Sequence, residues 1–170
     1  MAKKEPIKAA ILTISDRCAR GEREDESGPA IREFLPEIPA TLSAYEIVPD
    51  DLELIKAKLR SWRDEVDLII TTGGTGVSSR DVTPEATKAV IEKELPGFAE
   101  AMRAEGLKKT PHSIISRGVS GVSGRTLIVN LPGSPKAVRE SLSVILPAIP
   151  HTIGLIRGEE MECHEAKERR

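Results

Sequence analysis

Residues 71–87 of this chain have the types and spacing needed for chemistry on a phosphate group. Glycines at three of the four positions 73–76 allow positive φ angles, which can turn successive backbone N–H groups onto an anion. Residues 83–85 (Thr-Pro-Glu) are typical of a helix start, and a helix N-terminus adds partial positive charge. The apolar run at residues 66–70 indicates a buried strand before the loop. Strand, glycine loop and helix together predict a phosphate site.

The same loop holds a carboxylate, Asp81, that a simple phosphate-binding loop does not need. A carboxylate beside phosphates usually indicates a metal ion between them. Two simpler interpretations stay open, in which Asp81 caps the following helix or pairs with its neighbour Arg80. We favour the metal because Thr83 already supplies a capping hydroxyl.

Asp50 is a second candidate for the metal, and it follows a predicted strand at residues 41–48. Glu53 stands three positions later, which is a capping-box pattern, and that pattern alone favours a purely structural role for Asp50 at a helix start. Because Asp50 lies at a strand end, it can also face the same crevice as the glycine loop. A capping residue can still present one oxygen to a metal, so both roles stay open.

Three loops, at residues 15–28, 73–84 and 131–135, each follow a predicted strand and precede a helix with proline near its first position. In an open α/β sheet such loops lie at the carboxyl ends of the strands, where ligands bind. Any one of these loops could serve only to cap a helix. The three together favour a ligand crevice.

The sequence lacks the motifs of several other kinds of catalytic or binding site. The chain has no Gly-x-x-x-x-Gly-Lys-Ser/Thr, no Gly-x-Gly-x-x-Gly at the first helix and no Gly-x-Ser-x-Gly, which argues against P-loop, dinucleotide and serine-hydrolase sites. His112 and His151 are isolated, and Cys163-His164 has no partner at zinc spacing. No local motif marks Cys18 or Cys163 as a catalytic thiol.

Apolar runs and helical periodicity alternate along the chain and predict an α/β domain with a mainly parallel sheet. We expect one domain over residues 1–158 and a polar tail over residues 159–170. The expected strands are residues 7–14, 41–48, 66–72 and 126–130, with a short one at 113–116; the expected helices are residues 28–36, 50–62, 83–94, one around 98–102, and 135–149, and residues 120–124 are expected to form a turn.

Composition narrows the function classes further. The 170 residues are 39% hydrophobic and 31% charged, which is ordinary for one globular domain. Aromatic residues make up only 2%, so the core must be aliphatic and a stacking platform for nucleic acid is not expected. A net charge of -2 gives no general attraction to nucleic acid or membranes. With no apolar run of about 18 residues and no signal-peptide pattern, we expect a cytoplasmic protein.

From Ile7 to about Gly158 the sequence resembles the molybdopterin adenylyltransferases of the MogA/MoaB type, which also occur as the G domains of plant Cnx proteins and gephyrin. The matching stretches are residues 13–17 (Thr-Ile-Ser-Asp-Arg), 25–31 (Asp-Glu-Ser-Gly-Pro-Ala-Ile), 48–51 (Val-Pro-Asp-Asp), 72–87, 95–98 (Leu-Pro-Gly-Phe), 115–117 (Ile-Ser-Arg) and 130–136 (Asn-Leu-Pro-Gly-Ser-Pro-Lys).

This resemblance implies a three-layer α/β/α sandwich, usually a trimer, that joins ATP to molybdopterin with Mg²⁺ and releases pyrophosphate. A further expected partner is the molybdate-inserting enzyme of the next step. The resemblance assigns residues as follows: Asp50 and Asp81 as catalytic and metal-binding; Gly73, Gly74, Thr75, Gly76, Pro132, Gly133 and Ser134 as nucleotide-binding; Ser15, Asp25, Ser27 and Ser116 as binding molybdopterin and its phosphate.

Two other functions remain as alternatives. One is a pterin-binding or scaffold protein that keeps the fold without the transfer, and the presence of both aspartates argues against it. The other is a nucleotide or pyrophosphate hydrolase on a similar fold, as in competence-damage-like domains. The sequence does not distinguish a molybdenum from a tungsten pathway, and Arg17, Arg80 and Lys136 are equal candidates for added positive charge near the phosphates.

Overall fold

The computed structural model describes residues 5–159, which form a six-stranded sheet flanked by helices. The sheet order is β2-β1-β3-β6-β5-β4, and the pairs β1–β2, β1–β3 and β3–β6 are parallel, which confirms the predicted mainly parallel sheet. The two remaining pairs, β5–β6 and β4–β5, are antiparallel. The strands are β1 (Ile7–Ile14), β2 (Ala40–Val48), β3 (Leu68–Thr72), β4 (Lys93–Glu94), β5 (Ser120–Ser123) and β6 (Thr126–Leu131).

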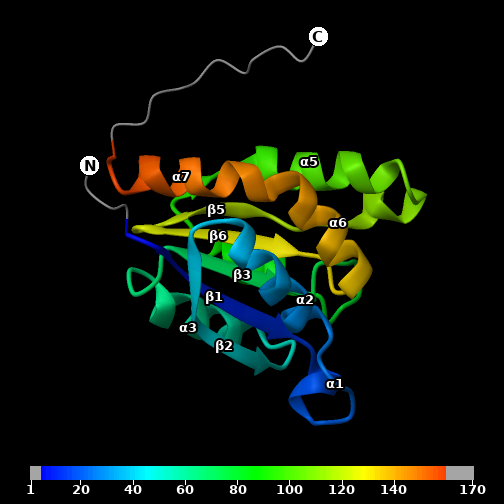
Figure 1. Cartoon of the computed structure of the whole chain (residues 1–170). Helices are drawn as coiled ribbons and strands as arrows, with labels where there is room; N and C mark the ends of the chain where they lie inside the picture. The colour runs from blue at the N-terminus through cyan, green and yellow to red at the C-terminus, as the bar shows by residue number, and fades with distance from the viewer. Residues whose placement is uncertain (1–4, 160–170) are drawn as a thin grey trace.

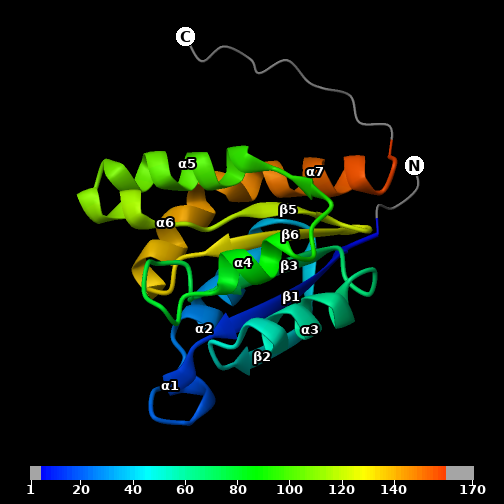
Figure 2. The same ribbon diagram turned by 180° about the vertical axis from the view of Figure 1, so that it is seen from behind.

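Helices cover both faces of the sheet and give three layers, as expected (Figure 1). Helices α2, α5, α6 and α7 lie on one face, and α3 and α4 lie on the other, as the view from behind shows (Figure 2). The helices are α1 (Asp16–Ala19), α2 (Ser27–Phe34), α3 (Leu52–Trp62), α4 (Thr83–Lys88), α5 (Pro96–Leu107), α6 (Pro135–Ile145) and α7 (Ile149–Ile156), with short 3₁₀ turns η1 (Leu35–Glu37), η2 (Pro111–Ile115) and η3 (Leu146–Ala148).

The core is aliphatic and lies on both sides of the central strands. In β1, Ile7, Ala9 and Ile11 pack in the cluster that contains α2, α5, α6 and α7, whereas Ala10 and Leu12 pack in the cluster that contains α3 and α4. Successive side chains of a strand point to opposite faces, so a strand buried on both sides must be apolar at nearly every position. This explains why the strand runs were easy to find in the sequence.

Three predicted elements are wrong, and all lie between β3 and β6 in the chain. The helix expected over residues 83–94 ends at Lys88, because the N–H groups of Glu92 and Leu95 donate to carbonyls of β5 and draw this segment into the sheet. The turn expected at residues 120–124 is mostly strand β5, which turns into β6 at Gly124. Residues 113–116 lie in or next to the 3₁₀ turn η2 and form no strand.

The helix expected over residues 135–149 is shorter than predicted, and a further helix that was not predicted follows it. Helix α6 ends at Ile145, and α7 begins at Ile149 with Pro150 in its first turn. Within residues 5–159, no helix is long and apolar enough to cross a membrane. The expected tail, including Cys163, lies outside the described residues except for Glu159.

Candidate active site

The three predicted loops meet at one edge of the sheet. Strands β1, β3 and β6 are neighbours in the sheet and run parallel. Their carboxyl ends are level, because Thr13 pairs with Thr72 and Thr72 pairs with Leu131. The loops that follow these strands therefore start side by side, at residues 15, 73 and 132. This confirms that the carboxyl ends of the strands bring the three loops together.

Side-chain hydroxyls tie these loops to one another. The Thr72 hydroxyl donates to the Pro132 carbonyl at 2.7 Å, and the Ser27 hydroxyl donates to the Gly133 carbonyl at 2.7 Å. Both donors are buried. The loop after β6 is thus held from two sides, by β3 and by α2.

The glycine loop has a backbone that only glycine adopts without strain. Gly73 and Gly74 have φ angles of 95° and 64°, and a Cβ atom on Gly73 would overlap the Ile14 carbonyl oxygen. Thr83 fastens this loop: its hydroxyl donates to the Gly73 carbonyl at 2.9 Å, and its N–H donates to the Gly74 carbonyl at 3.1 Å. The expected role of Thr83 as the helix cap is therefore wrong, since the N-cap of α4 is Val82.

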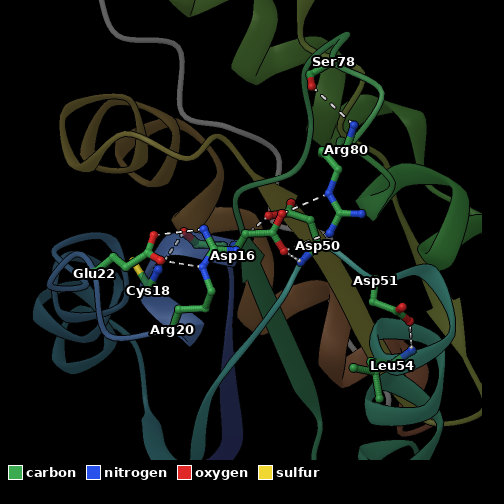
Figure 3. Close-up of polar contacts among 10 residues, drawn as sticks. Asp16, Cys18, Arg20, Glu22, Asp50, Asp51, Leu54, Ser78 and Arg80 are labelled. Carbon is green, nitrogen blue, oxygen red and sulfur yellow. Dashed lines mark hydrogen bonds and ion pairs between the residues drawn. The ribbon is translucent and has the colours of Figure 1, made fainter.

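Asp50 does not cap α3. Asp51 does so, accepting a hydrogen bond from the Leu54 N–H at 2.9 Å. The cap is therefore one residue later than predicted, and Leu54 stands where a capping box needs Glu or Gln. Asp50 instead exchanges hydrogen bonds with Asp16. The Asp16 N–H donates to Asp50 Oδ2 at 2.9 Å, and the Asp50 N–H donates to Asp16 Oδ1 at 3.0 Å. Figure 3 shows this pair beside Arg80.

The electrostatics around Asp50 favour a bound cation. Burial raises the pKa of Asp50, and the negative charges of Asp16 and Asp81 raise it further. The hydrogen bond from the Asp16 N–H lowers this pKa but does not cancel the rise. The nearby cation, Arg80, is engaged by Asp16: its Nε and Nη2 each donate to a carboxylate oxygen of Asp16 at 2.9 Å and keep the pKa of Asp16 below its usual range. The negative charge of Asp50 is therefore only partly compensated by the described residues around it.

Asp81 belongs to a tight turn within the glycine loop. Its Oδ2 accepts from the Ser78 N–H at 2.8 Å, and its own N–H donates to the Ser78 carbonyl at 3.0 Å. Arg80 pairs with Asp16, so the alternative of an Asp81–Arg80 ion pair is wrong. One carboxylate oxygen of Asp81 thus orders the turn, and the side chain also lines a pocket next to the glycine loop.

That pocket has a volume of about 410 Å³, which suits a small-molecule ligand. Its remaining walls come from α5, η2 and α6, and they include Met102, Ile115 and Ala137. The predicted site residues that line it are Gly74, Thr75, Gly76, Asp81, Ser116, Pro132 and Gly133.

A smaller pocket of about 140 Å³ lies on the other side of the loop after β6, and Gly133 lines both pockets. The predicted residues in the smaller pocket are Ser15, Asp25, Ser27, Gly73 and Gly133. Ser116 is thus separated from the other three residues assigned to molybdopterin. Asp50 and Ser134 line neither pocket: Asp50 Oδ1 lies 3.0 Å from the position that a Cβ atom on Gly74 would take, and Ser134 caps α6 through the Ala137 N–H.

Asp25 organises the smaller pocket. Its carboxylate accepts from the Thr13 hydroxyl at 2.6 Å, from the Ser27 and Gly28 N–H groups at 2.9 and 3.1 Å, and from the Tyr45 hydroxyl. Burial would raise the pKa of Asp25, but these donors lower it below its usual range. The oxygens of Asp25 are therefore largely occupied by the protein.

Asp50 and Asp81 fit a Mg²⁺ site in their chemistry. Within residues 5–159, no group of three or more His, Cys, Asp or Glu side chains is arranged to hold a metal. Mg²⁺ commonly takes one or two carboxylates and completes its shell with water and substrate phosphates. The charge of Asp81 acts on Asp50, so the two carboxylates lie near each other beside the glycine loop and would suit such a site.

Three residues that form hydrogen bonds in this region were not among the predicted site residues: Asp16, Tyr45 and Arg117, whose Nε donates to the Gly76 carbonyl. Asp16 and Arg117 lie inside the matching stretches at residues 13–17 and 115–117, which was the available signal. Tyr45 lies on an exposed strand with no motif around it, and only its contact with Asp25 identifies it. All three basic candidates, Arg17, Arg80 and Lys136, are exposed, and Arg80 forms an ion pair with Asp16.

Comparisons with known proteins show the family of this chain. A family model described as "probable molybdopterin binding domain" matches residues 10–151. The chain is 47% identical to the molybdopterin adenylyltransferase of Helicobacter pylori over 165 residues, covering 95% of this chain and 94% of that protein. It is 40% identical to gephyrin of Dictyostelium discoideum over 181 residues, covering 98% of this chain but 25% of gephyrin.

A solved structure gives the same result for the fold. The molybdopterin biosynthesis enzyme MoaB from Thermus thermophilus superposes with a TM-score of 0.85 at 54% identity, covering 90% of this chain and 98% of that chain. The chain therefore belongs to the molybdopterin-binding domain family, which includes the molybdopterin adenylyltransferases.

Proposed function

We propose that this protein is a molybdopterin adenylyltransferase that joins ATP to molybdopterin, gives adenylylated molybdopterin and releases pyrophosphate. The observation that carries the proposal is the position of Asp81, which lines the 410 Å³ pocket together with the glycine loop while Asp50 lies directly behind that loop. Adenylyltransferases of the same family, similar over nearly the whole chain, support the same conclusion.

In this reaction a phosphate oxygen of molybdopterin attacks the α-phosphorus of ATP. A new phosphorus–oxygen bond forms, the bond from the α-phosphorus to the bridging oxygen breaks, and pyrophosphate leaves with that oxygen. Both reactants are anions, so the main obstacle is their mutual repulsion. Catalysis then depends on positioning and electrostatic stabilisation, with no covalent intermediate on the enzyme.

The chain supplies this positioning through its loops. Backbone N–H groups of the glycine loop bind phosphate oxygens, and Thr83 keeps the loop in shape. Asp50 and Asp81 would hold Mg²⁺, which when bound neutralises the charge of the departing pyrophosphate.

The two pockets divide the substrates between them. We assign the nucleotide to the larger pocket with the glycine loop. The smaller pocket has room for only part of a ligand, and we assign it the phosphate end of molybdopterin, since Ser15 and Ser27 line it. Gly133 lies between the pockets, where the two reacting phosphates would meet.

The test is pyrophosphate release by the purified protein with ATP and Mg²⁺, with and without molybdopterin. The proposal predicts release only when molybdopterin is present, together with formation of the adenylylated product. Pyrophosphate or AMP formed without the pterin would indicate a hydrolase instead. Tight binding of molybdopterin with no turnover would indicate a binding protein.

The remaining features stay predictions. A homotrimer is checked by light scattering of the eluting protein, and the Mg²⁺ requirement by chelation and re-addition of the metal. The cytoplasmic location and the contact with a molybdate-inserting enzyme follow from the expected role in cofactor synthesis.

A further inference from the structure

We infer that Arg117 is a positioning residue for Asp81, because its guanidinium group closes the loop that carries this carboxylate. This inference rests on the proposed function for its catalytic consequence, but the structural part stands on the contacts of Arg117 alone. No motif assigned a role to this residue, which lies in the connection between η2 and β5.

The contacts of Arg117 join the two ends of the loop. Its Nε donates to the Gly76 carbonyl at 2.7 Å, and its Nη2 donates to the Asp81 carbonyl at 2.8 Å. The backbone N–H of Arg117 adds a third bond, to the Thr75 carbonyl at 2.9 Å. Residues 76–81 thus begin and end on the same guanidinium group.

Glu85 in turn fixes Arg117. Its carboxylate in the first turn of α4 forms an ion pair with Nη1 of Arg117. The hydrogen bond from Arg117 lowers the pKa of Glu85 against the effect of its burial, so the Glu85 carboxylate stays ionised at neutral pH. The chain of contacts therefore runs from α4 through Glu85 and Arg117 to the Asp81 loop.

Arg117 acts from behind the loop and not from inside the substrate pocket. Asp81 lines the 410 Å³ pocket and Arg117 does not; Arg117 lines an adjoining groove of about 390 Å³ together with Glu85, and Ser116 and Gly118 line both. The Arg117 side chain therefore holds the Asp81 segment from outside the 410 Å³ pocket.

Arginine suits this role better than lysine does. The guanidinium group is planar and offers five N–H donors in a fixed fork, so it can bind two carbonyls and a carboxylate at once. A lysine ammonium is a compact charge on a flexible stem, and it cannot reproduce the spread of these three contacts. A substitution by lysine therefore separates the fork geometry from the positive charge.

The test compares Arg117→Ala, Arg117→Lys and a matched control, Arg63→Ala. The Arg63 side chain is 38% exposed and paired with Glu92 and, at 3.5 Å, with Asp64. The Arg117 side chain is 37% exposed and paired with Glu85, so both alanine variants lose an arginine–glutamate ion pair of similar exposure. Arg63 follows α3 beside the start of β6, at the opposite end of the strands from the loops. Hydrogen exchange of residues 76–81 is measured in the protein without ligands, and kcat and KM are measured by pyrophosphate release.

Both Arg117 variants should exchange the Ser78 amide, which bonds to Asp81, about tenfold faster than the wild type. Their kcat should fall about tenfold or more while KM for ATP changes by less than about threefold, because Arg117 does not touch the pocket. Arg63→Ala should match the wild type in all three measurements.

The inference is overturned if Arg117→Ala behaves like Arg63→Ala, or if Arg117→Lys behaves like the wild type, since charge alone would then suffice. If Arg117→Ala does not fold, Arg117→Lys carries the comparison. Absence of turnover in the wild type rejects the proposed function instead, and the exchange rates still decide whether Arg117 closes the loop.

Discussion

Asp16 and Asp50 each donate a backbone N–H to the carboxylate of the other, at 2.9 and 3.0 Å. This reciprocal pair joins the loop after β1 to the loop after β2. Because Arg80 binds both oxygens of Asp16, the pair also extends to the glycine loop after β3. Asp50 and the segment that carries Asp81 are thus connected through one carboxylate that the sequence did not single out.

The first prediction separates Asp50 from its neighbour Asp51. Asp51→Ala removes the cap of α3 and should lower the free energy of unfolding by about 1 kcal/mol with activity retained. Asp50→Asn keeps an oxygen that can accept from the Asp16 N–H, so the fold should be stable, but turnover should fall about a hundredfold. Thermal melting and pyrophosphate release measure the two effects. The account is wrong if the losses fall on the opposite residues.

The second prediction concerns Gly73. Gly73→Ala places a Cβ atom onto the Ile14 carbonyl and forces a positive φ angle on alanine, so it should cost about 2 kcal/mol or more. Gly97→Ala is the control, because a Cβ atom there meets nothing within 4 Å. Denaturant unfolding measures both. Equal stability of the two variants would show that the loop can relax around Gly73.

The third prediction concerns Tyr45, the sole tyrosine of the chain. Burial and the hydrogen bond to Asp25 raise the pKa of Tyr45 well above its usual value of about 10. The ultraviolet signal of phenolate should therefore be absent near that pH in the folded protein and present in the denatured protein. Ordinary titration in the folded protein would show that the contact with Asp25 does not exist in solution.

The fourth prediction is a pH dependence from Asp67. Burial would raise the pKa of Asp67, but Arg157 and the Lys8 N–H, both donating to it, hold that pKa below its usual range of about 3.9. The Asp67–Arg157 pair contributes its full stabilisation above the pKa that Asp67 has in the unfolded chain. This stabilisation is lost as the pH falls through the lower pKa that Asp67 has in the folded protein. Asp67→Asn should cost about 1–2 kcal/mol at neutral pH and progressively less in acid.

The control for that prediction is Glu33→Gln. Glu33 pairs with Arg139 on the surface, where both side chains are largely exposed, so its loss should change stability by less than about 0.5 kcal/mol at any pH. Urea unfolding at several pH values compares the two variants. A cost for Asp67→Asn that does not shrink in acid would contradict the assignment.

Local patterns predicted strands β1, β2, β3 and β6 and the loops that follow β1, β3 and β6, but not the contacts between them. The apolar runs of β1, β3 and β6 are visible because both faces of these strands are buried. Strand β4 was missed because residues 93–94 join the sheet through pairing with β5, which local propensity does not contain.

The roles of the site residues show the same limit. Asp50 and Asp51 are the same residue type at adjacent positions, so a spacing rule alone could not tell the cap from the site residue. Arg117 contacts the glycine loop although about 40 residues separate them in the sequence. Tyr45, on strand β2, contacts Asp25 in the loop before α2. Such partners are set by the topology of the sheet, and they become visible only in the folded chain.

The most direct test of the central claim is the rate of adenylyl transfer by Asp81→Asn. Asparagine can still accept from the Ser78 N–H, so the turn and the fold should remain intact, as circular dichroism and the melting temperature would show. We predict that pyrophosphate release from ATP and molybdopterin falls by at least about a hundredfold at saturating Mg²⁺. A folded Asp81→Asn protein that turns over at nearly the wild-type rate would contradict the account.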